Sequence, residues 1–126
     1  MKRENKGKRI LIVDDEKPMA QALELKLNKL NFRAKAVFNG TEAIKLLNQE
    51  DFDLILTDLV MSPIDGFGIM EFLKSKNIKI PVIVLSNLGQ EEDLQRAKNL
   101  GAKDYFIKSN TPIIKVVGHI NKLLDQ

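Results

Sequence analysis

Cysteine is absent from this chain of 126 residues, which excludes disulfide bonds and metal sites built from thiolates. No apolar run approaches the roughly 18–20 residues that a membrane-spanning helix needs. The apolar residues 10–13 are too few to form the core of a secretory signal peptide, and acidic residues follow them. Linkers and low-complexity stretches are also missing. The sequence therefore predicts one soluble domain, and we expect it in the cytoplasm, where the lack of cysteine fits a reducing compartment.

The composition is ordinary for a globular protein, with 44% hydrophobic and 29% charged residues. The net charge is +3, and the densest basic cluster lies near the N-terminus, at Lys2, Arg3, Lys6, Lys8 and Arg9. Such a cluster could touch nucleic acid or an anionic surface, but a solvated, frayed terminus is the simpler interpretation. We expect no direct nucleic-acid or membrane partner for this domain.

Short apolar runs alternate with helical patterns five times. The runs cover residues 9–13, 33–38, 54–57, 81–85 and 104–107. Each is followed by a segment with apolar residues at helical spacing. Residues 54–56 are continuously apolar, which is typical of a parallel strand buried on both faces. The pattern predicts an α/β fold of the (βα)5 kind: a doubly wound, five-stranded parallel sheet in the order 2-1-3-4-5, with helices on both faces.

Helix boundaries carry their own signals. Pro18 suits the first turn of the first helix, and Asn31 suits its end. The leucines within residues 23–27 also alternate, which leaves a strand open, but the length and the proline favour a helix. Thr41 is the predicted N-cap of the second helix, and Gly101 follows the end of the fourth.

Polar side chains follow four of the predicted strands at the point where each strand ends. Because functional sites of doubly wound sheets lie beyond the carboxyl ends of the strands, we expect these side chains to converge there. They are Asp14 and Asp15 after the first strand, Asp58 after the third, Ser86 after the fourth and Lys108 after the fifth.

These residue types point to phosphoryl chemistry at a metal. Three carboxylates at one edge cannot all stay ionised without a counter-charge, and hard oxygen ligands are what Mg²⁺ takes, with Mn²⁺ as an alternative. An aspartate carboxylate can accept a phosphoryl group when cations surround the phosphoryl oxygens. Asp58 ends the central apolar strand and is the predicted nucleophile. Lys108 would supply a cation and Ser86 a hydroxyl donor.

The predicted site falls in four stretches of sequence. They read ILIVDDE (residues 10–16), DLILTDLVMSPIDG (53–66), PVIVLSN (81–87) and GAKDYFIKS (101–109). Together they resemble the receiver domain of two-component response regulators, in the form of a chemotaxis-regulator-like single domain. The resemblance runs from about residue 9 to residue 124, and we expect one receiver domain to fill residues 1–126.

The resemblance implies roles for the acidic residues and the lysine. Asp58 corresponds to the phosphorylated aspartate, and Lys108 to the lysine that pairs with the phosphoryl group. Asp14 and Asp15 correspond to the metal-binding acids, of which Asp15 is the more direct ligand. The backbone carbonyl of Val60 corresponds to a further metal ligand.

It also implies a switch and its partners. Ser86 corresponds to the hydroxyl residue that moves toward the phosphoryl group, and Tyr105 to the aromatic side chain that follows it. The surface of the fourth helix, fifth strand and fifth helix then changes.

The resemblance further implies that the phosphoryl donor is a histidine kinase or a histidine phosphotransfer protein. The receiver catalyses its own phosphorylation and dephosphorylation, so we expect a signalling switch rather than an enzyme. The output partner is not identified by the sequence, a weak homodimer is compatible with it, and a stand-alone regulator is favoured over an excised receiver.

Three positions depart from the family pattern. Ser62 stands where proline is frequent, with Pro63 one residue later. Ser109 replaces the proline that usually follows the lysine in a cis peptide bond, so the placement of Lys108 is open to test. Asn87 stands where a small residue is common, and could affect how water reaches the phosphoryl group.

Other functions fit the residues less well. A flavodoxin-like phosphate binder needs backbone and hydroxyl hydrogen-bond donors after the first strand, where this chain has acids that repel phosphate. A haloacid-dehalogenase-like phosphatase needs its nucleophile after the first strand and an acid two residues later. A degenerate receiver that acts only as a binding module would lack some of the five site residues. His119, the single histidine, is expected on the side of the last helix, away from the site.

Overall fold

The computed structural model describes residues 7–125, so Lys2, Arg3 and Lys6 of the predicted basic cluster lie outside the described residues. The strands are β1 (Arg9–Val13), β2 (Arg33–Val37), β3 (Leu54–Thr57), β4 (Val82–Ser86) and β5 (Asp104–Ile107). The helices are α1 (Lys17–Lys29), α2 (Gly40–Gln49), α3 (Gly66–Ser75), α4 (Glu91–Asn99) and α5 (Ile113–Leu124), with a 3₁₀ turn at Lys108–Asn110.

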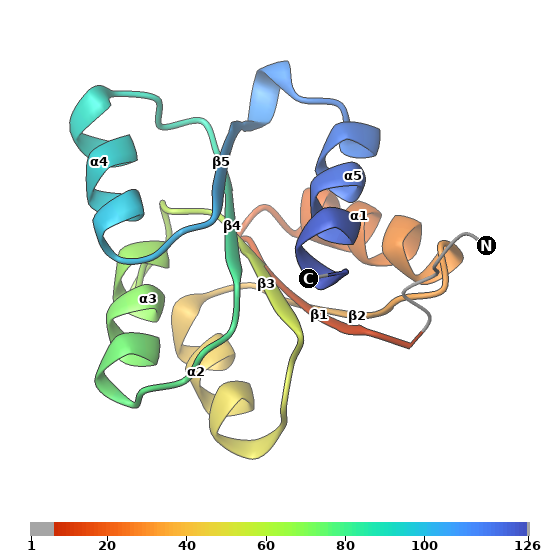
Figure 1. The fold of residues 1–126 in the computed structure, drawn as a ribbon, viewed down its shortest axis with the longest axis horizontal. Helices are drawn as coiled ribbons and strands as arrows, with labels where there is room; N and C mark the ends of the chain where they lie inside the picture. The colour runs from red at the N-terminus through yellow and green to blue at the C-terminus, as the bar shows by residue number, and fades with distance from the viewer. Residues whose placement is uncertain (1–6, 126) are drawn as a thin grey trace.

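The five strands form one parallel sheet in the order β2-β1-β3-β4-β5. In Figure 1, α2, α3 and α4 lie on one side of the sheet, and α1 and α5 lie on the other. This confirms the predicted doubly wound (βα)5 fold and its strand order. No helix within residues 7–125 is long and apolar enough to cross a membrane.

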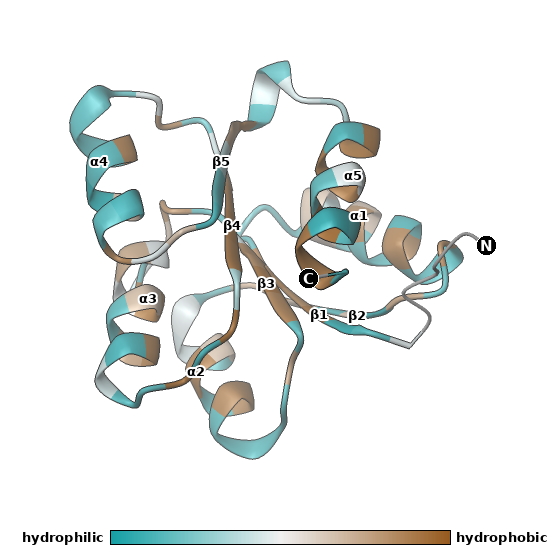
Figure 2. Cartoon of the chain, viewed as in Figure 1, coloured by the Kyte–Doolittle hydropathy of each residue, from teal (hydrophilic) through white to brown (hydrophobic). Residues whose placement is uncertain are grey.

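Two apolar cores explain the continuous apolar runs. Leu11 and Val13 of β1 pack with side chains of α2, α3 and α4, whereas Ile10 and Ile12 pack with those of α1 and α5. Successive side chains of a strand point to opposite faces, so a strand covered on both faces is apolar throughout. Figure 2 shows this in β3 and β4, which are hydrophobic along their length.

The helix boundaries follow most of the predicted signals. Pro18 lies in the first turn of α1, and residues 23–27 are helical. Asn31 after α1 and Gly101 after α4 both have positive φ, at 74° and 102°, as expected of residues that end helices.

The predicted N-cap of α2 is wrong. Asn39, not Thr41, caps this helix, because its Oδ1 accepts a hydrogen bond of 2.9 Å from the backbone N–H of Glu42. The Asn39 side-chain Nδ2 also donates to the Glu42 carboxylate at 3.4 Å, so the two side chains pair at the start of the helix. Thr41 lies inside the first turn.

Candidate functional site

The carboxyl ends of β1, β3 and β5 bring three predicted site residues into contact. Asp14 follows β1, Asp58 follows β3 and Lys108 follows β5, and all three side chains are buried. The Lys108 Nζ donates to Asp14 Oδ2 at 2.8 Å and to Asp58 Oδ2 at 2.9 Å. Parallel pairing of neighbouring strands thus places residues 44 or more positions apart on one small surface.

The two carboxylate oxygens of Asp58 have different surroundings. Its Oδ1 accepts the backbone N–H groups of Leu59, at 2.6 Å, and Val60, at 3.3 Å. Its Oδ2 faces Lys108. A Cβ atom at Gly66 would lie 2.3 Å from the Asp58 carbonyl oxygen, so glycine is needed there for the loop to close under the aspartate. One oxygen is therefore held by the backbone while the other points to a cation.

Glu16 is a third carboxylate on the lysine, and its role was not assigned from the sequence. Its Oε1 accepts from Lys108 Nζ at 2.6 Å although most of its side chain is exposed. Its backbone N–H donates to Asp14 Oδ1 at 2.9 Å, which directs the chain after β1 toward the site. The run of three acids from Asp14 to Glu16 is the sequence signal that could have identified it.

Burial and charge act in opposite directions on the buried ions. Burial alone would lower the pKa of Lys108, but its hydrogen bonds to Asp14, Glu16 and Asp58 outweigh that effect and raise the pKa. Burial raises the pKa of Asp14, and the hydrogen bond from Lys108 offsets this only in part. Three carboxylates thus share a single ammonium, which leaves negative charge for a further cation to balance.

The donor set fits a small divalent cation. Carboxylate oxygens of Asp14, Glu16 and Asp58 lie within 4.8 Å of one another, and oxygen donors of this kind suit Mg²⁺. Asp15 is exposed and lines the cavity beside Asp58 that is described below, but its carboxylate contributes no oxygen to this group of three. The roles of Asp15 and of the Val60 carbonyl as metal ligands stay predictions.

A cavity of about 310 Å³ is lined by Asp58. Ser86 and Lys108 line it, and so do the exposed residues Val60 and Asn87. Four of the five predicted polar residues therefore surround one space, with Asp14 behind them in contact with Lys108. The space is open to a reactant that approaches Asp58.

The two predicted switch residues meet on the backbone of one residue, Leu88. The Ser86 Oγ accepts the backbone N–H of Leu88 at 3.3 Å, and the Tyr105 hydroxyl donates to the Leu88 carbonyl at 2.5 Å. Burial, followed by the nearby carboxylates of Asp93 and Asp58, raises the pKa of Tyr105 to about 12. The tyrosine thus remains a donor at neutral pH.

Ser109 makes a contact that a proline could not make. Its backbone N–H donates to Asn87 Oδ1 at 2.9 Å, which ties the end of β5 to the loop after β4. Within residues 7–125 the one cis peptide bond is Ser62–Pro63, so the Lys108–Ser109 bond is trans. Lys108 still reaches Asp58.

His119 lies outside this cluster, as expected. It is on α5, where its Nδ1 is 3.2 Å from Asp104 Oδ2 and its ring contacts Phe106 edge-on.

Comparisons with known proteins agree with this geometry. Residues 10–117 match the response regulator receiver domain family. The probable transcriptional regulator ycf27 of Cyanidium caldarium is 36% identical over 103 residues, which cover 82% of this chain but 41% of that protein. The chain thus spans less than half the length of this curated relative.

Two solved structures show the same fold. The receiver domain of the Francisella response regulator 1452 superposes with a TM-score of 0.89 at 30% identity, over 94% of this chain and 98% of that one. The response regulator TrrA from Thermotoga maritima, in complex with Mg²⁺ and BeF, superposes with a TM-score of 0.81 at 26% identity, over 92% and 98% of the two chains. This chain belongs to the receiver domain family of two-component response regulators.

Proposed function

We propose that this receiver domain accepts a phosphoryl group on Asp58. The observation that carries the proposal is the contact of Lys108 Nζ with Asp58 Oδ2, at 2.9 Å, on the floor of an open cavity. Backbone N–H groups hold the other oxygen of Asp58 and fix the direction of the carboxylate. An oriented carboxylate beside a cation is what an acyl phosphate acceptor needs.

The transfer needs little covalent help from the protein. The donor in this proposal is a phosphohistidine of a partner protein. An oxygen of Asp58 attacks phosphorus, an O–P bond forms, and the bond from phosphorus to the histidine nitrogen breaks. The electron pair leaves with that nitrogen, which takes a proton from solvent. Lys108 stabilises the charge on the phosphoryl oxygens, and the Ser86 hydroxyl offers a hydrogen bond once it turns away from Leu88.

A divalent cation completes the set of charges. Asp14, Asp15, Glu16 and Asp58, with the Val60 carbonyl, are the residues that would hold Mg²⁺ or, alternatively, Mn²⁺. When bound, the metal supplies positive charge for the phosphoryl oxygens. The cluster of three carboxylate oxygens and the Mg²⁺ and BeF in the TrrA structure support this assignment.

The signal would leave the site through Leu88. If Ser86 turns toward a phosphoryl oxygen, it releases the Leu88 N–H. The loop then keeps only its bond to Tyr105, and a movement of the loop would carry Tyr105 with it. Tyr105 lies on β5 between α4 and α5, so its movement would change that face of the domain. This supports the predicted switch surface of α4, β5 and α5.

The family supports a histidine kinase or a histidine phosphotransfer protein as the donor. We propose a signalling switch that acts on itself rather than an enzyme for a separate substrate. The chain spans 41% of its relative ycf27, so the proposal covers the receiver domain and names no output activity or output partner.

Beryllium fluoride, which mimics a phosphoryl group, tests the acceptor directly. Calorimetry should show binding that requires Mg²⁺, is lost in Asp58→Asn and is kept in Asp51→Asn, an exposed aspartate outside the cavity. Binding that persists in Asp58→Asn would refute the assignment of Asp58.

A further inference from the structure

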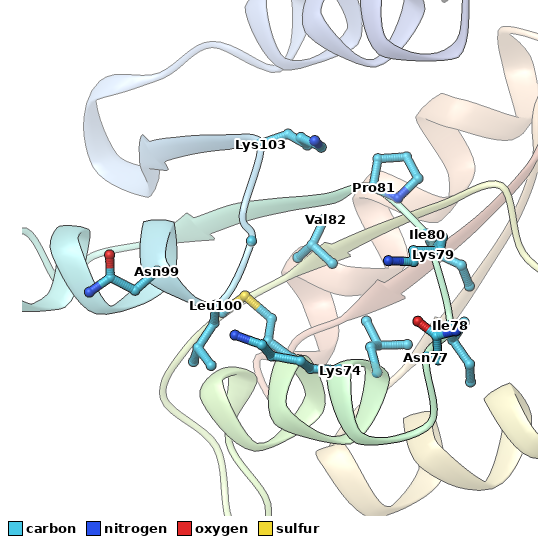
Figure 3. Close-up of a pocket in the computed structure, with 13 residues that line it drawn as sticks. Lys74, Asn77, Ile78, Lys79, Ile80, Pro81, Val82, Asn99, Leu100 and Lys103 are labelled. Atoms are coloured by element: carbon cyan, nitrogen blue, oxygen red, sulfur yellow. The ribbon is translucent and has the colours of Figure 1, made fainter.

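A second hollow lies at the end of the sheet opposite Asp58. The basal cavity, as we call it, has a volume of about 530 Å³ and is formed by the second half of α3, the loop into β4, the end of α4 and the turn into β5. Figure 3 shows side chains from these segments around one space. The residues of the phosphoacceptor site do not line it.

The floor of the basal cavity is aliphatic. Met70, Leu73 and Val82 are buried beneath it, and Ile80 and Leu100 are half-buried at its sides. The volume is within the range of ligand-binding cavities, and the floor can accept a bulky apolar group. In the part of the chain that the structure describes, no aromatic residue lines the cavity.

The rim is basic. Lys74, Lys79 and Lys103 line the cavity and are exposed, and among residues 7–125 no acidic residue lines it. Within residues 7–125 the side chains of these three lysines have no hydrogen bond or ion pair. Lys74 lies in the last turn of α3, where it complements the helix dipole. Lys79 and Lys103 lie outside any helix, so that explanation does not cover them.

More lysines extend the positive charge beyond the rim. Lys76 follows α3, and Lys98 lies in the last turn of α4; both are exposed. A single small anion would neutralise only part of a charged surface of this extent. An extended chain with several carboxylates would match it better.

We propose that the basal cavity binds an acidic peptide segment of a partner protein, with one bulky apolar side chain of the segment inserted onto the aliphatic floor. Nucleic acid fits less well, because base binding uses aromatic platforms and the lining cations are lysines without arginine. This site is independent of the phosphoacceptor chemistry at Asp58.

The probe is a short fluorescein-labelled peptide in which glutamates flank one central phenylalanine. Anisotropy should show binding that weakens as salt is raised. The variant Lys74→Gln/Lys79→Gln/Lys103→Gln should bind about tenfold more weakly. A control, Lys45→Gln/Lys115→Gln/Lys122→Gln, removes three exposed lysines elsewhere and should leave the affinity unchanged. Replacing the phenylalanine of the peptide by alanine should also weaken binding.

Amide chemical shifts locate the bound peptide on the intact chain. Residues 74–82 and 99–103 should shift, while those around Asp58 should not. Equal affinity of the two lysine variants, no binding, or shifts elsewhere would overturn the proposal. So would a labelled single-stranded DNA oligonucleotide that binds more tightly than the peptide, since that result would assign the surface to nucleic acid.

Discussion

Ser86 and Tyr105 hold the two backbone polar groups of one residue, Leu88: the serine Oγ accepts its N–H, and the tyrosine hydroxyl donates to its carbonyl. Ser86 is fully buried and lines the cavity beside Asp58, whereas Tyr105 is partly exposed on the edge strand β5. The Leu88 backbone is therefore a direct link between the acceptor site and the edge of the sheet.

Removal of the tyrosine hydroxyl should loosen this link. Tyr105→Phe is expected to lower the free energy of unfolding by about 1 kcal/mol, because the Leu88 carbonyl loses a hydrogen bond. Hydrogen exchange of the amides around Leu88 should become faster while exchange in β1 stays slow. Denaturant unfolding and exchange measurements check both effects. Unchanged exchange near Leu88 would show that the hydroxyl does not hold the loop.

Tyr105 should also resist ionisation. It is the single tyrosine of the chain, which has no tryptophan, so an absorbance titration reports on it alone. The midpoint is expected at about pH 12 in the folded protein, because burial raises its pKa. A midpoint near the ordinary value of 10 would contradict the effect of partial burial on this hydroxyl.

The sign of the pH effect on stability follows from the same pKa. Above pH 10 the unfolded chain loses the tyrosine proton while the folded chain keeps it, so unfolding releases a proton. The free energy of unfolding should therefore fall as pH rises from about 10 to about 12. Tyr105→Phe should remove this part of the fall and leave the part due to Lys108, whose pKa is also raised.

Lys108→Met should expose the repulsion among the site carboxylates. It is expected to destabilise the metal-free protein by about 3 kcal/mol, because buried negative charge loses its partner. Mg²⁺ should then raise the Tm of this variant more than that of the unsubstituted protein, since a bound cation stabilises the folded state. Lys45→Met, at an exposed position, is the control. An equal effect of Mg²⁺ on all three proteins would contradict a metal site at these carboxylates.

The tie between the loop after β4 and the end of β5 depends on the Asn87 side chain. Asn87→Ala should lower the free energy of unfolding by about 1 kcal/mol, because the Ser109 N–H loses its acceptor. Ser109→Ala keeps that N–H and should change stability by less than about 0.5 kcal/mol. Thermal unfolding of the two variants provides the comparison, and equal losses would show that the backbone contact is unimportant.

The sequence was sufficient to predict the architecture because the strongest signals were local. Continuous apolar runs such as residues 10–13 and 54–56 favour strands covered on both faces. Right-handed crossovers leave few strand orders, of which 2-1-3-4-5 is a common one for a small doubly wound sheet. Asp14, Asp58 and Lys108 could be placed together for the same reason, since each directly follows a strand.

What the sequence missed depends on side-chain conformation. The run of acids from Asp14 to Glu16 marks Glu16 as a candidate, but its contact with Lys108 from an exposed position depends on the conformation of its side chain. Threonine is a frequent N-cap, which favours Thr41 as the cap of α2. Asparagine is as frequent a cap, and the pairing of Asn39 with Glu42 three residues later is the better signal. The contact between Asn87 and Ser109 joins two loops and required the folded chain.

The central claim is that Asp58 accepts a phosphoryl group with the help of a divalent cation. Its most direct test is the intact mass of the protein after incubation with acetyl phosphate and Mg²⁺ and a rapid quench. We predict one added phosphoryl group that disappears without metal and in Asp58→Asn, and that persists in Asp51→Asn. An adduct of equal amount in Asp58→Asn, or no adduct together with no binding of beryllium fluoride, would contradict the account.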